Sequence, residues 1–239
     1  MNKLKNFILL ALLLATISVN AQNDSINKCD EKINHHNFSM FLGYGLRLSS
    51  SPSDIIDNNA QNEEHFKTIR HGIQINFAYE YMLKPFLGLG FKASAFNSYD
   101  GFFHKGITGD SVEYKDDTYI FYVGPSIKYV LPKINDKLDL YIRGTLGYLS
   151  FRDSQQRATA APSTGKLTAT NATYTAKTLG YGLDCGIDYS INDYLSLGFN
   201  FAFLGGEVSN FKFGEDKLKA KESENLSRLN FSLGVVIKL

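Results

Sequence analysis

The segment from Arg228 to Leu239 has the sequence R-L-N-F-S-L-G-V-V-I-K-L. Side chains alternate between the two faces of an extended chain, so residues two apart share a face. One face carries only apolar residues: Leu229, Phe231, Leu233, Val235, Ile237 and Leu239. The other carries Arg228, Asn230, Ser232, Gly234 and Lys238, with Val236 as its single apolar member. The pattern predicts a β-strand with one greasy face and one polar face.

A strand of this length suits a tilted crossing of a bilayer, which takes roughly 9–11 residues. It resembles the C-terminal strand of bacterial outer-membrane β-barrels, which the barrel-assembly machinery recognises as a partner. Most such strands end in an aromatic residue, and Leu239 departs from that pattern.

The first 21 residues have the features of a secretory signal. Lys3 and Lys5 precede a short apolar run from Phe7 to Ala15, and Val19-Asn20-Ala21 offers small residues for cleavage. The apolar run is too short for a helical membrane span of about 20 residues. We therefore predict a signal peptide at 1–21, a flexible periplasmic arm at 22–37 and a barrel domain at 38–239.

Seven more segments show the same two-faced alternation, which brings the predicted number of strands to eight, an even number as in bacterial barrels. They are Phe38–Leu48, Thr68–Tyr81, Phe86–Phe96, Thr118–Leu131, Leu138–Phe151, Thr178–Tyr189 and Tyr194–Leu204.

The connections alternate between short and long. The short ones, at 82–85, 132–137 and 191–193, carry turn residues; the long polar ones lie at 49–67, 97–117, 152–177 and 205–225. Tyrosines lie beside both kinds of connection, as in the two aromatic girdles of a membrane barrel. The pattern predicts an all-β fold: an eight-stranded antiparallel up-and-down transmembrane β-barrel with short periplasmic turns and long extracellular loops.

The polar face distinguishes this barrel from a soluble lipid carrier of the lipocalin kind, whose apolar face lies inside. It holds many of the 20 glycines: Gly43, Gly45, Gly72, Gly88, Gly90, Gly124, Gly147, Gly180, Gly182, Gly186, Gly198 and Gly234. Glycine weakens strands, but the crowded interior of eight strands needs small residues. We therefore predict that the polar face lines the lumen and the apolar face contacts lipid.

The same face carries charges that must pair or remain hydrated in a narrow lumen. The predicted network of ion pairs comprises Arg47, Arg70, Glu80, Lys92, Lys128, Asp139, Arg143, Asp184, Asp188, Arg228 and Lys238. Its favoured role is a structural plug, and the alternative is a path for protons or small ions.

Charge and cysteine content limit the other classes of function. Removing the leader takes away Lys3 and Lys5 and leaves 23 basic against 24 acidic residues, a balance that gives no support to a nucleic-acid partner. Cys29 and Cys185 could form one disulfide. We favour two separate thiols, because Cys185 lies within a strand and Cys29 within the arm.

Candidate chemical groups are few, and we expect no enzyme, cofactor or metal. His71 and His104 have no evident nucleophile and orienting carboxylate nearby in sequence. The His35-His36 pair and the predicted acidic loop with Asp110, Glu113, Asp116 and Asp117 lack metal-binding spacing, so solvation is favoured. Asp24-Ser25-Ile26 and Asp110-Ser111-Val112 resemble a short acceptor for envelope O-glycosylation in Gram-negative bacteria.

Leader, strand alternation, loop asymmetry and closing strand together resemble the small outer-membrane β-barrels of the OmpA/OmpX type, and more particularly the PorT-like proteins with an outer membrane protein beta-barrel domain. The resemblance implies contact with outer-membrane lipid and an envelope protein partner, within a secretion assembly as for PorT-like proteins. We expect a non-enzymatic barrel that displays its loops for adhesion or partner binding. The alternatives are a narrow channel for small solutes and a lipid-modifying enzyme.

Overall fold

The computed structural model describes residues 34–49, 67–105, 111–132, 135, 137–161, 166–213 and 216–239. Asn34–Leu239 forms one compact unit. The predicted signal peptide, most of the predicted arm and Cys29 lie outside the described residues. The first strand begins at His36, two residues before the predicted start of the barrel.

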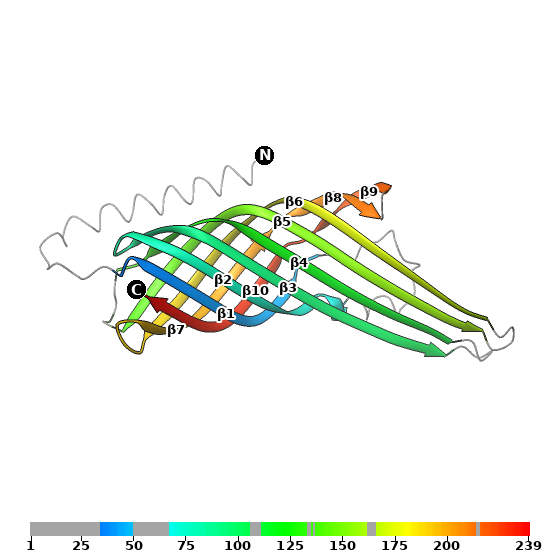
Figure 1. The fold of residues 1–239 in the computed structure, drawn as a ribbon, viewed down its shortest axis with the longest axis horizontal. Coiled ribbons are helices and arrows are strands. Elements are labelled where there is room, and N and C mark those ends of the chain that lie inside the picture. Colours follow the sequence, from blue (N-terminus) through cyan, green and yellow to red (C-terminus); the bar gives the residue numbers. More distant parts are fainter. Residues whose placement is uncertain are drawn as a thin grey trace, which may run out of the picture. The chain divides into compact units, whose positions relative to one another are not determined.

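Eight antiparallel strands form a closed ring, which confirms the predicted fold class (Figure 1). Neighbours along the chain pair from β1 to β7, and β10 closes the ring between β7 and β1. The strands of the ring are β1 His36–Arg47, β2 His71–Lys84, β3 Leu87–Lys105, β4 Ser111–Val130, β5 Leu138–Ala161, β6 Lys166–Ser190, β7 Leu195–Gly205 and β10 Arg228–Lys238. A hairpin of β8 Glu207–Phe213 and β9 Asp216–Asn225 lies outside the ring.

The last strand closes the barrel against the first. β1 and β10 pair without interruption from Asn37 opposite Lys238 to Arg47 opposite Arg228. On β10, Phe231, Leu233, Val235 and Ile237 face outward, and Val236 is fully buried in the interior. The period-two pattern therefore assigns both faces of this strand correctly, including its one apolar interior residue.

Short turns join the strands at one end of the barrel, called here the turn end. The side-chain oxygen of Asn192 accepts hydrogen bonds from the backbone N–H groups of Tyr194 and Leu195, at 2.9 and 2.8 Å. An asparagine that bonds the backbone a few residues ahead is a common way to reverse a chain, which explains the tight link between β6 and β7.

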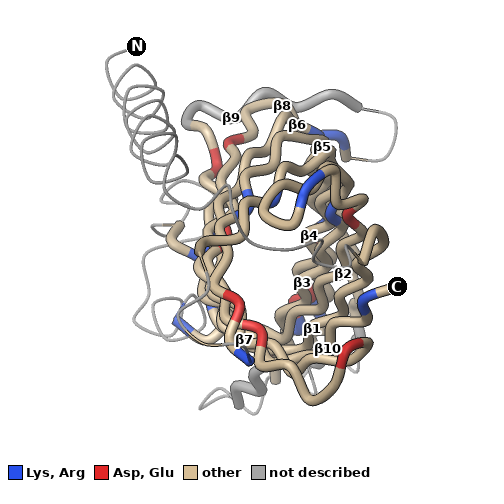
Figure 2. The backbone as a smooth tube through the Cα atoms, turned by 90° about the vertical axis from the view of Figure 1, so that its left-hand side faces the viewer, with Lys and Arg blue, Asp and Glu red and all other residues tan. Residues whose placement is uncertain are grey.

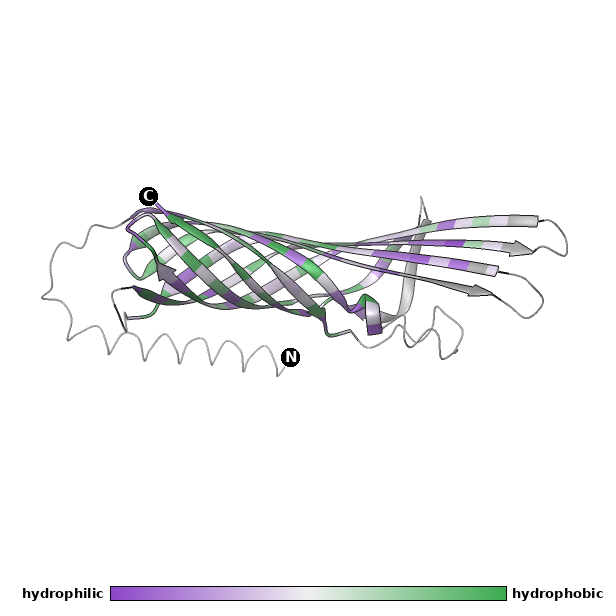
Figure 3. Ribbon diagram, turned by 90° about the horizontal axis from the view of Figure 1, so that it is seen from below, coloured by the Kyte–Doolittle hydropathy of each residue, from purple (hydrophilic) through white to green (hydrophobic). Residues whose placement is uncertain are grey.

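Three predicted long loops are largely strands, and this corrects the prediction. β3 and β4 stay paired as far as Lys105 opposite Ser111, and β5 and β6 as far as Ala161 opposite Lys166. β8 and β9 both lie in the third of these predicted loops, 205–225, and β8 pairs with β6 near Tyr174. Four strands, β3 to β6, thus continue past the rest of the barrel as a blade, here defined as 98–105, 111–118, 152–161 and 166–175 (Figures 1 and 3). The β5 and β6 segments of the blade are rich in Ser, Thr and Ala, and the β3 and β4 segments carry several charged residues. Neither pair of segments was therefore recognised by the alternation that identified the other strands.

Apolar and polar residues mix along the barrel strands (Figure 3), and the exposed large hydrophobic side chains make the outer surface apolar. Leucines there are as much as 67% exposed, as at Leu233, whereas charged Lys92 and Asp184 are 0% exposed. A water-soluble barrel would show the opposite distribution. Among the described residues, no helix has the length and hydrophobicity to cross a membrane.

Candidate functional site

The most distinctive group of side chains lies inside the barrel near the turn end. Glu80 of β2, Lys92 of β3, Arg143 of β5 and Asp184 of β6 are each 0–2% exposed. The ammonium of Lys92 lies 2.6 Å from Asp184, and Arg143 bridges Glu80 at 2.7 Å and Asp184 at 3.1 Å. These ion pairs link the neighbouring strands β2 and β3 to β5 and β6 (Figure 2). A buried charge is costly unless paired, so the alternation of signs is what allows this layer to fold.

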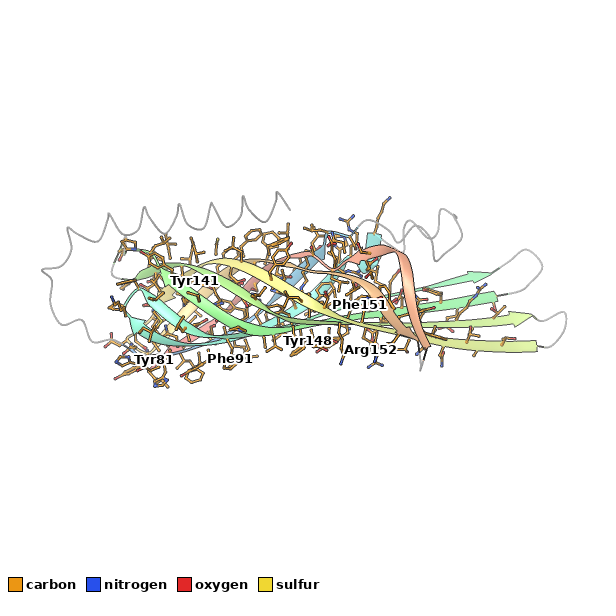
Figure 4. All side chains as sticks on the ribbon, turned by 90° about the horizontal axis from the view of Figure 1, so that it is seen from above. Tyr81, Phe91, Tyr141, Tyr148, Phe151 and Arg152 are labelled. Carbon is orange, nitrogen blue, oxygen red and sulfur yellow. The ribbon has the colours of Figure 1, made fainter. Side chains whose placement is uncertain are left out.

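A second pair extends this ionic layer toward the turn end. Lys128 lies 3.3 Å from Asp188, and its ammonium also lies 4.2 Å from the ring centre of Tyr141. Tyr141 is buried inside the barrel (labelled in Figure 4). Its hydroxyl accepts a hydrogen bond from Asn200 at 3.0 Å. A side chain at Gly186 would collide with the Tyr141 ring, so this glycine provides the space that the ring occupies.

Two predicted lumen residues form a less buried pair at the rim. Lys238 lies 2.6 Å from Asp139, and both side chains are partly exposed. Lys238 also donates a hydrogen bond to the hydroxyl of Ser190 at 3.3 Å. This pair joins the last strand of the barrel to β5 and β6.

The opposite end of the lumen has its own charged group. Arg47 lies 2.8 Å from Glu224 of β9, and Arg70 donates to the Arg47 carbonyl at 3.1 Å. Asp153, on the β5 segment of the blade, accepts a hydrogen bond from Thr118 at 3.0 Å. Burial, followed by the neighbouring Asp116, raises the pKa of Asp153 to about 7. Glu224 was not predicted, because its loop gave no periodic signal.

Between the two charged groups lies an apolar layer that the sequence analysis missed. It consists of buried side chains on the inward face: Phe96, Ile120, Tyr122, Leu149, Phe151, Ala176, Leu204, Val208 and Leu226. The hairpin contributes through Val208 and through Phe211, whose ring makes an edge contact with Phe151 at 6.1 Å. The sequence did contain this information. The members of the layer that lie on barrel strands occupy inward-facing positions of the alternating pattern, yet they are apolar.

The outward face carries rings at both ends of its apolar band. Tyr81 and Phe91 lie toward the turn end, and Tyr148 lies farther along the barrel, followed by Arg152 (Figure 4). The ammonium of Lys177 lies 5.8 Å from the Tyr148 ring. Charged groups next to aromatic rings are typical of the boundary between a membrane and water.

The remaining candidates lie at separate places on the strands. His71 and Tyr44 form a hydrogen bond and stack on the outer surface, and His36 stacks with Tyr79. His104 lies on β3, opposite Val112 of β4. Cys185 is a free, exposed thiol on the outer face. In the described part of the chain, no group of three His, Cys, Asp or Glu residues is placed to hold a metal ion.

The predicted acidic loop is part of β4, and its members separate. Glu113 pairs with Lys115, and Asp117 accepts a hydrogen bond from Asn97 at 2.6 Å. Asp116 is 4% exposed on the inward face, so the prediction of a solvated carboxylate was wrong for this residue. Asp110 lies outside the described residues.

The family model for the outer membrane protein beta-barrel domain matches residues 7–238. A search of curated proteins finds no match. Among solved structures, the outer membrane protein OprG from Pseudomonas aeruginosa is 16% identical, with a TM-score of 0.46, covering 87% of this chain and 99% of that one. Neisserial surface protein A is 11% identical, with a TM-score of 0.45, covering 85% and 97%. The outer membrane protease OmpT from Escherichia coli is 9% identical, with a TM-score of 0.41, covering 90% and 100%.

Proposed function

Because the chain belongs to the outer membrane protein beta-barrel domain family and is therefore an outer-membrane protein, we propose that it is a non-enzymatic scaffold that displays its blade for partner binding. The partner is a protein of the cell envelope or the cell surface. The blade is the single feature that carries the proposal, because it extends past the strands that close the barrel.

The edges of the blade offer backbone groups to a partner. β2 pairs with β3 only as far as Asn97, so β3 from Ser98 onward has β4 as its one paired neighbour in the described chain. On the other edge, β6 pairs with β8 only at Tyr174 to Ala176. Unpaired strand edges can accept an additional strand through main-chain hydrogen bonds. An extended peptide segment of a partner protein therefore fits this site.

The filled lumen supports display over conduction. An eight-stranded barrel has an interior just wide enough for side chains. Here the ionic and apolar layers occupy successive levels of that interior, with Arg143 and Leu149 both 2% exposed or less. Passage of a solute would require both layers to open.

Site-specific photo-crosslinking in intact cells tests the proposal. A photoreactive residue replaces Tyr99 or Thr173, which are exposed on the two edge strands, and the control replaces lipid-facing Leu233. We expect a discrete protein adduct from an edge position and none from the control.

Three outcomes contradict the proposal. Edge positions that give only the adducts of the control would remove partner binding by the blade. Steady single-channel conductance of the purified barrel in planar bilayers would favour the channel. An altered lipid A in a deletion strain, detected by mass spectrometry, would favour a lipid-modifying enzyme.

A further inference from the structure

Among the residues that the structure describes, five cationic side chains are buried in the lumen at 5% exposure or less: Arg47, Lys92, Lys128, Arg143 and Arg228. Four of them have a carboxylate within ion-pair distance, as described above. Arg228 has none among the described residues, and its direct neighbour across the β1–β10 ladder is Arg47, which has the same charge. An unpaired buried guanidinium costs several kcal/mol, so a missing counter-ion has a strong physical reason to be present.

The contacts of Arg228 leave part of its donor capacity unused. One terminal nitrogen donates to the hydroxyl of Ser94 at 3.1 Å, and the guanidinium lies 5.5 Å from the centre of the Phe96 ring. Its Nε and Nη1 atoms are buried and have no partner in the described chain. An arginine presents five N–H donors in a fixed fork, so these open positions face a defined direction.

Buried amides with unmet hydrogen bonds lie on the same strands and their neighbours. The side-chain nitrogens and oxygens of Gln74, Asn76 and Asn230 are all buried without a partner in the described chain. Asn76 is directly opposite Ser94 in the β2–β3 ladder, and Asn230 is two residues from Arg228 on the inward face of β10. Buried polar atoms that lack partners in one region imply a bound polar ligand, to which the amide nitrogens and Arg228 can donate.

Gly45 of β1 allows the groups around these amides to pack closely. A side chain at Gly45 of β1 would meet the Phe96 ring at 2.7 Å and the Asn230 side-chain oxygen at 3.0 Å. β1 lies between β10 and β2, so this residue lies between Asn230 and the strand of Gln74 and Asn76. Phe96 and Leu204 of the apolar layer lie directly opposite Gln74 and Arg228 in the strand ladders.

We propose that Arg228, with Gln74, Asn76 and Asn230, binds a small inorganic anion of the halide kind inside the barrel. The donors are one cationic guanidinium and several neutral amides, and this set suits an ion with a single negative charge. The buried position and the neighbouring aromatic ring favour a compact ion over an organic acid. This site is independent of partner binding by the blade.

Anomalous diffraction from the folded full-length barrel tests the site directly. The protein is refolded and crystallised in sodium bromide, and we expect an anomalous peak within hydrogen-bond distance of the Arg228 Nε and Nη1 atoms. A wild-type crystal without that peak would overturn the proposal.

Unfolding in urea provides the second measurement, with sodium chloride compared against sodium gluconate at equal ionic strength. A ligand that binds only the folded state at 100 times its Kd lowers the unfolding equilibrium constant about 100-fold. We expect the wild type to be more stable in chloride than in gluconate. The control R152M should show the same difference, because Arg152 lies on the exposed outer face.

Two variants should abolish the difference in stability between chloride and gluconate. R228M deletes the charge, and N230D supplies a carboxylate on the same face of β10 as an internal counter-ion. Equal stability in the two salts for either variant supports the proposal. A chloride effect that persists in N230D contradicts it, and that variant decides the matter if R228M does not fold.

Discussion

The lumen contains two layers that solve the same packing problem with opposite chemistry. Near the turn end, Glu80, Lys92, Arg143 and Asp184 fill the barrel with interlocked charges. Farther along, Ile120, Leu149 and Leu204 fill it with hydrocarbon, as the core of a soluble protein does. Arg228 lies where the two meet, since it bonds Ser94 and lies near Phe96.

The two layers differ in the kind of substitution that destabilises them. An apolar layer responds to lost volume, because its stability comes from burial and close packing. An ionic layer responds to a single lost charge, because the remaining partners are then buried without compensation. The two layers should therefore rank differently when each is damaged by one substitution.

Asp184→Ala should produce the largest effect. It removes the carboxylate shared by Lys92 and Arg143. Breaking a buried pair by deleting one partner costs about 3–5 kcal/mol, and we expect a loss of that size in urea unfolding of the barrel in lipid vesicles.

The double variant K92M/D184L is the control for the ionic layer. It replaces one ion pair by apolar side chains while Arg143 keeps Glu80. Such replacements are often neutral or stabilising, so we expect it to recover most of the lost stability. If Asp184→Ala alone were as stable as the wild type, the ionic layer would have to be hydrated and not sealed from water.

Leu149→Ala should come next, with a loss of about 3 kcal/mol from burial and cavity formation. The matched control is Leu146→Ala on the same strand, since Leu146 is 55% exposed on the outer face and Leu149 is 0% exposed. Lipid chains can fill the gap left by the control. Equal losses for the two variants, measured in the same vesicles, would contradict an apolar layer inside the barrel.

The sequence predicted the strands of the barrel well, but it predicted the side chains of the lumen only in part. Alternation identified the outward face, because lipid contact demands apolar residues at every second position. It also identified charges on the inward face, but it could not pair them, since Lys92 and Asp184 lie 92 residues apart. The inward Phe96 and Leu149 were missed because the lumen was expected to be polar throughout. Glu224 and the hairpin were missed because their stretch has no period, and pairing with a distant strand decides its structure.

Asp153 should give a smaller, pH-dependent effect at the outer end of the lumen. Its folded-state pKa of about 7 lies above the ordinary value for a carboxyl group, which is about 4. The folded state therefore binds a proton that the unfolded chain has released, and stability should fall as pH rises from about 4 to about 7. We expect a loss on the order of 1–2 kcal/mol after allowing for partial exposure.

Urea unfolding at several pH values measures this slope. Asp153→Asn keeps the shape and stays neutral, so the fall between pH 4 and 7 should shrink in that variant. A slope that is unchanged in Asp153→Asn would assign the pH dependence to another group.

Glu113→Gln should give the smallest effect, and it completes the comparison of buried with exposed charges. Glu113 and Lys115 lie 2.7 Å apart on β4, almost the same separation as Lys92 and Asp184, but their side chains are 48% and 46% exposed. Water screens an exposed pair, and holding two long side chains together costs entropy. We therefore expect no resolvable shift in the urea midpoint. A shift approaching that of Asp184→Ala would mean that distance, and not burial, sets the strength of ion pairs in this barrel.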